Sequence, residues 1–193
     1  YGTRQGELPC KNEAGAAVLF LDSDILKNCM LLDIPGFGTG DRIEDDAMSF
    51  RAKENADILI YMSVANAFMR ATDIQYLKDS ISQLSPIENK EKNKLTPLSN
   101  LFVLASQAHT VEKGNLKALE EILDRGCDSL TKTMPDAFWA AREAISGYSY
   151  QSDDLRKRFF AYTTDNEKLR EPFEEEFKKI IEALPRLIEK NAK

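Results

Sequence analysis

Short apolar runs alternate with amphipathic stretches along most of the chain, and this alternation is the clearest signal in its sequence. In the amphipathic stretches, apolar residues recur at spacings of three and four, which is the helical period. Buried strands that alternate with helices are typical of an α/β domain. The pattern therefore predicts an α/β fold, a mostly parallel sheet covered by helices, with a long helix at the C-terminus.

The predicted strands are the apolar runs, and the predicted helices lie between them. The strands are residues 17–21, 29–32, 57–64, 101–105 and 158–163, and the helices are 45–55, 72–84, 112–130, 135–145 and 167 to the end. The run 57–64 is apolar at nearly every position, which predicts a strand buried on both faces. Pro185 is expected to kink or interrupt the last helix.

The composition is that of an ordinary globular protein and changes this picture little. Of 193 residues, 42% are hydrophobic and 30% charged, which suits one large domain. The net charge of -6 argues against a nucleic-acid partner, because a broad footprint on phosphates needs a basic surface. Three cysteines without a C-x-x-C motif favour free thiols in a reducing compartment, so we expect a cytoplasmic location.

Candidate chemistry begins at Asp33-Ile34-Pro35-Gly36, which follows the apolar run 29–32. A carboxylate at the end of a buried strand can hold Mg²⁺ through water, and a glycine lets a backbone N–H approach a terminal phosphate. We therefore interpret this tetrapeptide as part of a site for a nucleotide phosphate and magnesium.

Two further strands end in polar residues. Ser106, Gln107 and His109 follow the run 101–105, and Thr163 lies at the end of the run 158–163. In α/β sheets, ligands bind beyond the carboxyl ends of the strands. We therefore expect segments 33–36, 106–109 and 162–164 to meet at one edge of the sheet.

With these motifs, the chain resembles the nucleotide-binding domain of the dynamin family of large GTPases, in particular bacterial dynamin-like proteins. The resemblance covers roughly residues 15–185 and is strongest at Asp33-Ile34-Pro35-Gly36. It implies that Asp33 holds Mg²⁺, that Pro35 and Gly36 contact the γ-phosphate, and that the Gly36 amide serves catalysis. It also implies that Ser106, Gln107 and His109 contact the base together with Thr163.

The sequence departs from the family pattern in two places. The phosphate-binding G-x-x-x-x-G-K-[ST] motif does not occur in it, and Gln107 and His109 stand where the family has lysine and aspartate. A neutral histidine accepts one hydrogen bond, so guanine discrimination should be weaker. Because the chain opens with Tyr1, we expect an upstream segment to supply that motif and the first strand. These residues alone should then be inactive, with one sheet edge exposed.

The resemblance implies a GTP-binding, GTP-hydrolysing domain that uses Mg²⁺ and belongs to a protein of membrane remodelling. It implies a homodimer formed through this domain, membrane contact through other segments, a partial GTPase domain over residues 1–184, and a linker to a helical bundle beginning at 185–193. Two alternatives stay open: a non-catalytic interaction module that has lost its phosphate loop, and an ATP-using relative of the same fold.

Overall fold

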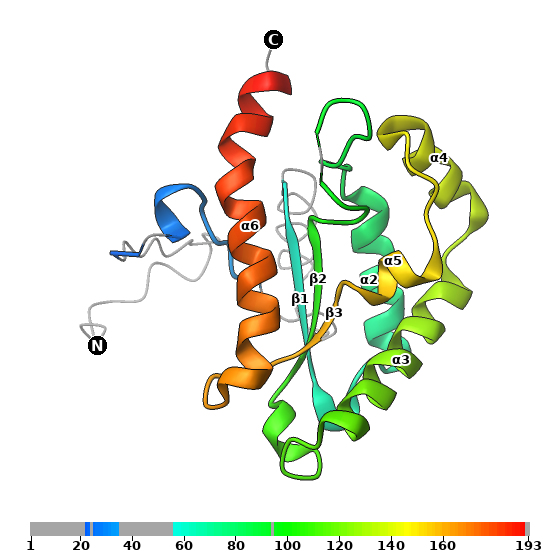
Figure 1. Cartoon of the computed structure of the whole chain (residues 1–193). Coiled ribbons are helices and arrows are strands. Elements are labelled where there is room, and N and C mark those ends of the chain that lie inside the picture. The colour runs from blue at the N-terminus through cyan, green and yellow to red at the C-terminus, as the bar shows by residue number, and fades with distance from the viewer. Residues whose placement is uncertain (1–21, 24, 35–55, 94, 192–193) are drawn as a thin grey trace, which may run out of the picture.

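The computed structural model describes residues 22–23, 25–34, 56–93 and 95–191, and within them the fold is α/β. Three parallel strands form one sheet in the order β1-β2-β3 (Figure 1). They are β1 (Leu59–Val64), β2 (Leu101–Ser106) and β3 (Phe159–Ala161). The predicted strands 57–64, 101–105 and 158–163 and their parallel arrangement are confirmed.

The central strand and the edge strand differ sharply in burial. In β2, Leu101 to Ala105 are all buried, since β1 and β3 pair with its two sides and helices cover its faces. In β1, Met62 is 55% exposed and Val64 is 40% exposed. The prediction that residues 57–64 are buried on both faces is therefore wrong. Their hydrophobicity alone did not reveal that no described strand pairs with the outer edge of β1.

Helices cover both faces of the sheet (Figure 1). One face carries helices α2 (Ala71–Gln83), α3 (Leu116–Thr133), α4 (Asp136–Ser146) and α5 (Ser152–Arg156). The opposite face carries α6 (Glu167–Asn191). Three short 3₁₀ helices complete the described elements: η1 (Ile25–Lys27), η2 (Ala65–Ala67) and η3 (Ala108–Thr110). Sequence analysis did not predict α5, because a five-residue helix has too few positions to show a period.

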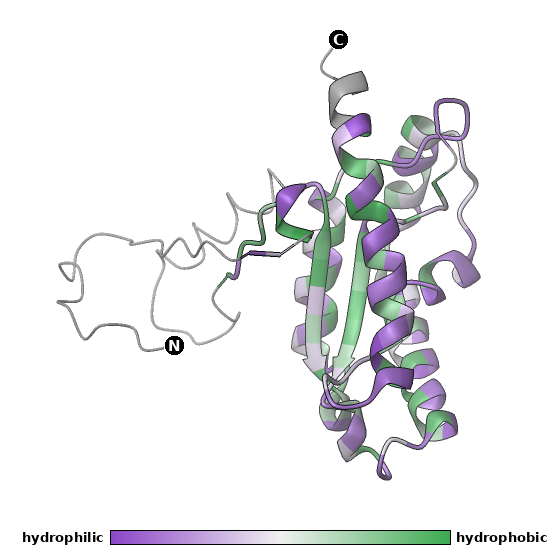
Figure 2. Cartoon of the chain, turned by 60° about the vertical axis from the view of Figure 1, so that its left-hand side comes forward, coloured by the Kyte–Doolittle hydropathy of each residue, from purple (hydrophilic) through white to green (hydrophobic). Residues whose placement is uncertain are grey.

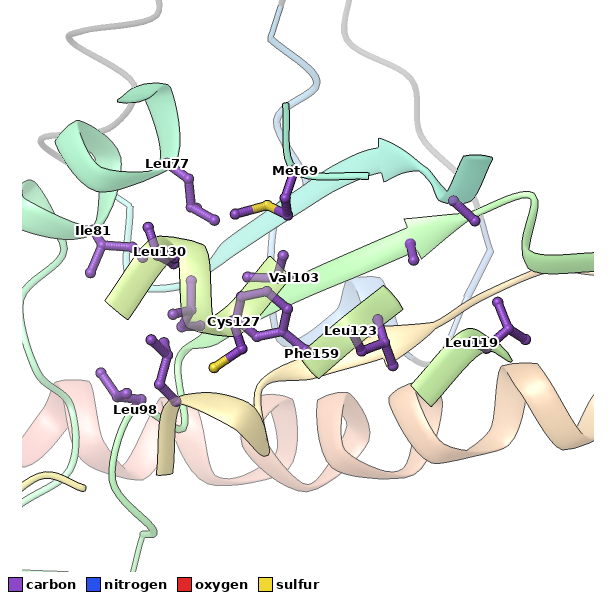
Figure 3. Packing of buried hydrophobic residues seen from close by; sticks show 14 of the residues in the cluster. Met69, Leu77, Ile81, Leu98, Val103, Leu119, Leu123, Cys127, Leu130 and Phe159 are labelled. Atoms are coloured by element: carbon purple, nitrogen blue, oxygen red, sulfur yellow. The ribbon is translucent and has the colours of Figure 1, made fainter. Parts of the chain in front are cut away.

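The sheet separates two hydrophobic clusters. In the larger cluster, side chains of α2 and α3 pack on β2 and β3, among them Leu77, Leu123 and Phe159 (Figure 3). In the smaller one, Phe102 of β2 is fully buried and meets Phe173 and Phe177 of α6 edge to face, with ring centroids 5.5 and 5.6 Å apart. Apolar and polar residues alternate along α6 in Figure 2, as expected for a helix with one face on a sheet.

Local backbone chemistry sets where α3 begins. Glu112 and Lys113 have φ values of 44° and 59°, which a right-handed helix excludes. Asn115 then caps α3, because its Oδ1 accepts hydrogen bonds from the amides of Lys117 and Ala118. The predicted start at residue 112 is thus four residues early.

The last helix runs through both of its prolines. Pro172 and Pro185 lie inside α6, which is one continuous helix from Glu167 to Asn191. The predicted interruption at Pro185 is therefore wrong, and a kink there stays a prediction. A proline inside a helix removes one backbone hydrogen bond. Burial of the neighbouring Ile181 and Leu184 side chains, which are 3% and 5% exposed, offsets this loss and stabilises the helix in the turn before Pro185.

The run 29–32 is not a strand in the structure. Cys29 packs against the smaller hydrophobic cluster, but Met30, Leu31 and Leu32 are 84%, 58% and 58% exposed. An apolar run becomes a strand only with a neighbouring strand to pair with, and no described strand pairs with this one. The predicted strand 17–21 and helix 45–55 lie outside the described residues. No helix in the described part of the chain combines the length and apolar character needed to cross a membrane.

A buried ion pair fastens the segment between α2 and β2. The Arg142 guanidinium forms a two-point contact with the Glu88 carboxylate and also donates to Leu84 O and Asn100 Oδ1. The side chains of Arg142 and Glu88 are 2% and 0% exposed. Glu88 Oε1 further accepts from the amide of Leu98 and the hydroxyl of Tyr150. Each charge is thus compensated by its partner, which burial requires.

Candidate functional site

The carboxyl ends of the three parallel strands meet at one edge of the sheet, and the polar candidates lie in the loops that follow them. Ser106 is the last residue of β2, and its hydroxyl donates to the carbonyl of Ser63 in β1 at 3.2 Å. Ligands of α/β sheets bind at this edge because loops, and not further strands, surround it. The edge is therefore the candidate site.

Two contacts join the loops that follow β2 and β3. His109 Nδ1 lies 2.9 Å from Thr163 Oγ1, and the amide of Ala108 donates to the carbonyl of Tyr162 at 3.1 Å. Thr163 is 5% exposed, while His109 is exposed. The contact engages Nδ1 and leaves Nε2 as the ring atom for another partner. In a neutral imidazole, Nε2 accepts a hydrogen bond if the proton is on Nδ1, and Nε2 donates one if it carries the proton itself.

Gln107 adopts a left-handed backbone conformation between β2 and η3, with φ 54° and ψ 35°. Its carbonyl accepts from the amide of Thr110 at 2.9 Å and from the Thr110 hydroxyl at 2.7 Å, which closes the turn. Its side chain is exposed and forms no hydrogen bond with another described residue. The fixed turn thus leaves the side-chain carboxamide of Gln107 available to a ligand.

The end of β1 adds residues that the sequence analysis did not single out. Asn66 Nδ2 donates to Thr110 Oγ1 at 2.7 Å, which ties the loop after β1 to the loop after β2. Beneath it, Asp73 Oδ2 accepts from the Ser63 hydroxyl at 3.0 Å and from the Arg70 amide at 3.1 Å. Burial, and secondly the Asp73 carboxylate, raises the pKa of Tyr61 above its usual range. The position of Asn66 just after the predicted strand 57–64 was the available signal for that residue.

The structure shows no contact between Asp33 and the described residues of these loops. Asp33 is exposed, and none of the described residues forms a hydrogen bond or ion pair with it. Pro35 and Gly36 lie outside the described residues. Within the described ranges, no group of three histidine, cysteine, aspartate or glutamate side chains is arranged to hold a metal ion. The roles of Asp33, Pro35 and Gly36 at magnesium and phosphate stay predictions.

Two of the three segments expected at the edge, 106–109 and 162–164, meet there. Ser106, Gln107, His109 and Thr163 come together there, and they offer hydroxyl, amide and imidazole groups without a described carboxylate directed at them. Such a set can hydrogen-bond the edge of a heterocycle or a sugar, but it lacks the charges that bind a polyphosphate. Comparison of the chain with protein-family models, with curated proteins and with solved structures found no match.

Proposed function

We propose that this chain is part of a nucleotide-binding domain of a dynamin-like GTPase, and that the edge formed by β2 and β3 contacts the nucleoside. The observation that carries the proposal is the His109–Thr163 contact, which holds the loops after two parallel strands together at the edge where α/β sheets bind ligands. The dynamin-like resemblance assigns these same loops to the base.

Gln107 and His109 are the residues we assign to base recognition. The Gln107 side chain would lie along the base, and His109 Nε2 would accept or donate one hydrogen bond. Discrimination between guanine and adenine should be modest, because an aspartate would offer two acceptor oxygens to guanine where His109 offers one nitrogen. This property of His109 favours an ATP-using domain as a second candidate.

Hydrolysis would need Mg²⁺ held by Asp33 and a backbone N–H of Gly36 at the γ-phosphate. Phosphoryl transfer depends mainly on positioning and on stabilising charge, so a phosphate-binding motif is also needed. That motif is absent from these 193 residues. The outer edge of β1 supports the proposal, since the family places another strand beside it and none of the described strands pairs there. The same absence of the motif keeps a non-catalytic module as the alternative.

Fluorescent GTP and ATP analogues, titrated into the chain and followed by anisotropy, test the base site. We expect weak, saturable binding that unlabelled nucleosides compete for, and a loss of about fivefold or more in His109→Ala and Thr163→Val. Thr133→Val is the matched control, since the Thr133 hydroxyl donates to Leu130 O within α3, away from the edge. If Thr163→Val and Thr133→Val bind the nucleotide analogues with equal affinity, the base assignment is wrong.

Asp33 is tested separately, in the full-length protein. We expect Asp33→Ala to abolish Mg²⁺-dependent GTP hydrolysis without changing the circular dichroism spectrum, because the metal would lose its water-mediated carboxylate. Unchanged turnover would eliminate Asp33 as the magnesium residue, whatever the base-site titration gives.

A further inference from the structure

A surface hollow of about 400 Å³ lies between the β1–α2 connection and the middle of α3. Side chains of both segments line it, chiefly Asn66, Phe68, Arg70, Ile122, Arg125 and Ser129. Its volume lies within the range of binding pockets in proteins. The hollow adjoins the candidate site at Asn66, but neither His109 nor Thr163 lines it.

The two arginines of this hollow differ from most others in the chain. The structure describes seven arginines, and four of them lie within 4.0 Å of a carboxylate: Arg142, Arg156, Arg158 and Arg170. Within the described part, no carboxylate pairs with Arg70, Arg125 or Arg186, and the first two line the same hollow. In a chain with 32 acidic and 26 basic residues, two arginines that line one hollow without a described carboxylate partner form a local site of opposite charge.

Tight packing fixes the walls of the hollow. A Cβ atom at Gly126 would lie 2.8 Å from Phe68 Cε1 and 2.9 Å from Met69 Cγ, so glycine allows the β1–α2 connection to pack directly on α3. Phe68 also meets Phe159 of the core edge to face, with centroids 6.0 Å apart. Arg125 Nε donates to Glu121 O at 3.1 Å, which anchors its guanidinium on α3. The hollow therefore exists before any ligand binds.

We propose that this hollow binds an acidic peptide segment of a partner protein. Two carboxylates of the peptide would pair with Arg70 and Arg125, and an apolar side chain between them would lie against Phe68 and Ile122. Charge complementarity favours this occupant, because guanidinium groups form two-point contacts with carboxylates. The net charge of -6 disfavours a long polyanion such as nucleic acid, whereas a short acidic peptide needs only the two local cations.

The test uses a fluorescein-labelled peptide with the central sequence Glu-Glu-Leu-Glu-Glu, titrated with the chain at low salt and followed by anisotropy. We expect Arg70→Glu and Arg125→Glu each to weaken binding about fivefold or more, since each reverses one charge of the pair. Arg186→Glu is the matched control: it makes the same charge change on α6, and we expect it to alter the affinity less than about twofold. A probe with glycine in place of leucine should bind more weakly.

Three outcomes would overturn the proposal. One is the absence of saturable binding by the wild-type chain, with folding checked by circular dichroism. Another is an equal loss of peptide affinity in Arg186→Glu, which would mean that the peptide responds to the overall charge of the protein and not to this hollow. The third is displacement of the peptide by inorganic pyrophosphate at a lower concentration than by unlabelled peptide, which would identify a phosphate site instead. The first two outcomes leave the nucleotide proposal untouched, since the variants and the probe differ, whereas the third would add a phosphate site to it.

Discussion

His109 Nδ1 and Thr163 Oγ1 lie 2.9 Å apart although 54 residues separate them in the sequence. The contact joins the loops after β2 and β3 above a buried backbone hydrogen bond from Ala108 to Tyr162. The hydrogen bonding of the His109 imidazole therefore depends on Thr163, which follows another strand. This dependence can be tested by NMR spectroscopy.

Thr163→Val should change the balance between the two neutral tautomers of the His109 imidazole. Valine keeps the shape of threonine but removes the hydroxyl, so Nδ1 loses its partner, and we expect a stability loss of about 1 kcal/mol. His109 is the only histidine of the chain, so its ¹⁵N imidazole signals in an NMR spectrum need no assignment. Identical Nδ1 and Nε2 shifts in the wild type and the variant would mean that the contact is absent in solution.

Arg142→Met should lower the free energy of unfolding by about 3 kcal/mol or more, measured by urea denaturation. The substitution leaves the fully buried Glu88 carboxylate without its counter-charge, which is the most destabilising way to alter a buried ion pair. Arg156→Met is the control, because Arg156 pairs with Glu120 and Asp124, whose side chains are 65% and 62% exposed. Exposed pairs contribute about 1 kcal/mol or less. Equal losses in the two variants would contradict a buried network.

Tyr150 should make the stability fall as the pH rises from about 10 to about 12. Burial, opposed by the hydrogen bond with Ser146 and reinforced by Glu88, raises the pKa of the phenol to about 12. The unfolded chain releases this proton near pH 10 and the folded protein retains it, so the stabilisation is complete below about pH 10 and disappears at higher pH. Urea denaturation of the wild type and of Tyr150→Phe gives the test. Parallel pH curves would show that Tyr150 does not titrate as described.

The outer edge of β1 should promote self-association of the chain. An unpaired edge strand with exposed apolar side chains is a template for pairing with another chain. We expect Met62→Lys/Val64→Lys to shift the sedimentation profile toward monomer, since charges on an edge oppose such pairing. Ile145→Lys is the control because Ile145 is 62% exposed but lies on α4. A shift of the same size in the control would attribute the association to general hydrophobicity.

The sequence by itself determined the strands and the longer helices from residue 57 onward. Leu101 to Ala105 could be recognised as a buried strand, and α2, α3, α4 and α6 as helices, because their apolar spacing reflects local geometry. The position of Ser106, Gln107, His109 and Thr163 at one sheet edge also followed, since parallel strands end on the same side.

Tertiary structure alone decided what each apolar run packs against. The runs 29–32 and 57–64 read alike in the sequence, yet among the described residues the first is largely exposed and pairs with no strand, and the second pairs with a strand on one side alone. Hydrophobicity records a preference for burial but does not specify the neighbour, and pairing depends on which strands meet in space. The same reason explains why the His109–Thr163 contact and the Glu88–Arg142 pair, each 54 residues apart, were not visible before the chain was folded.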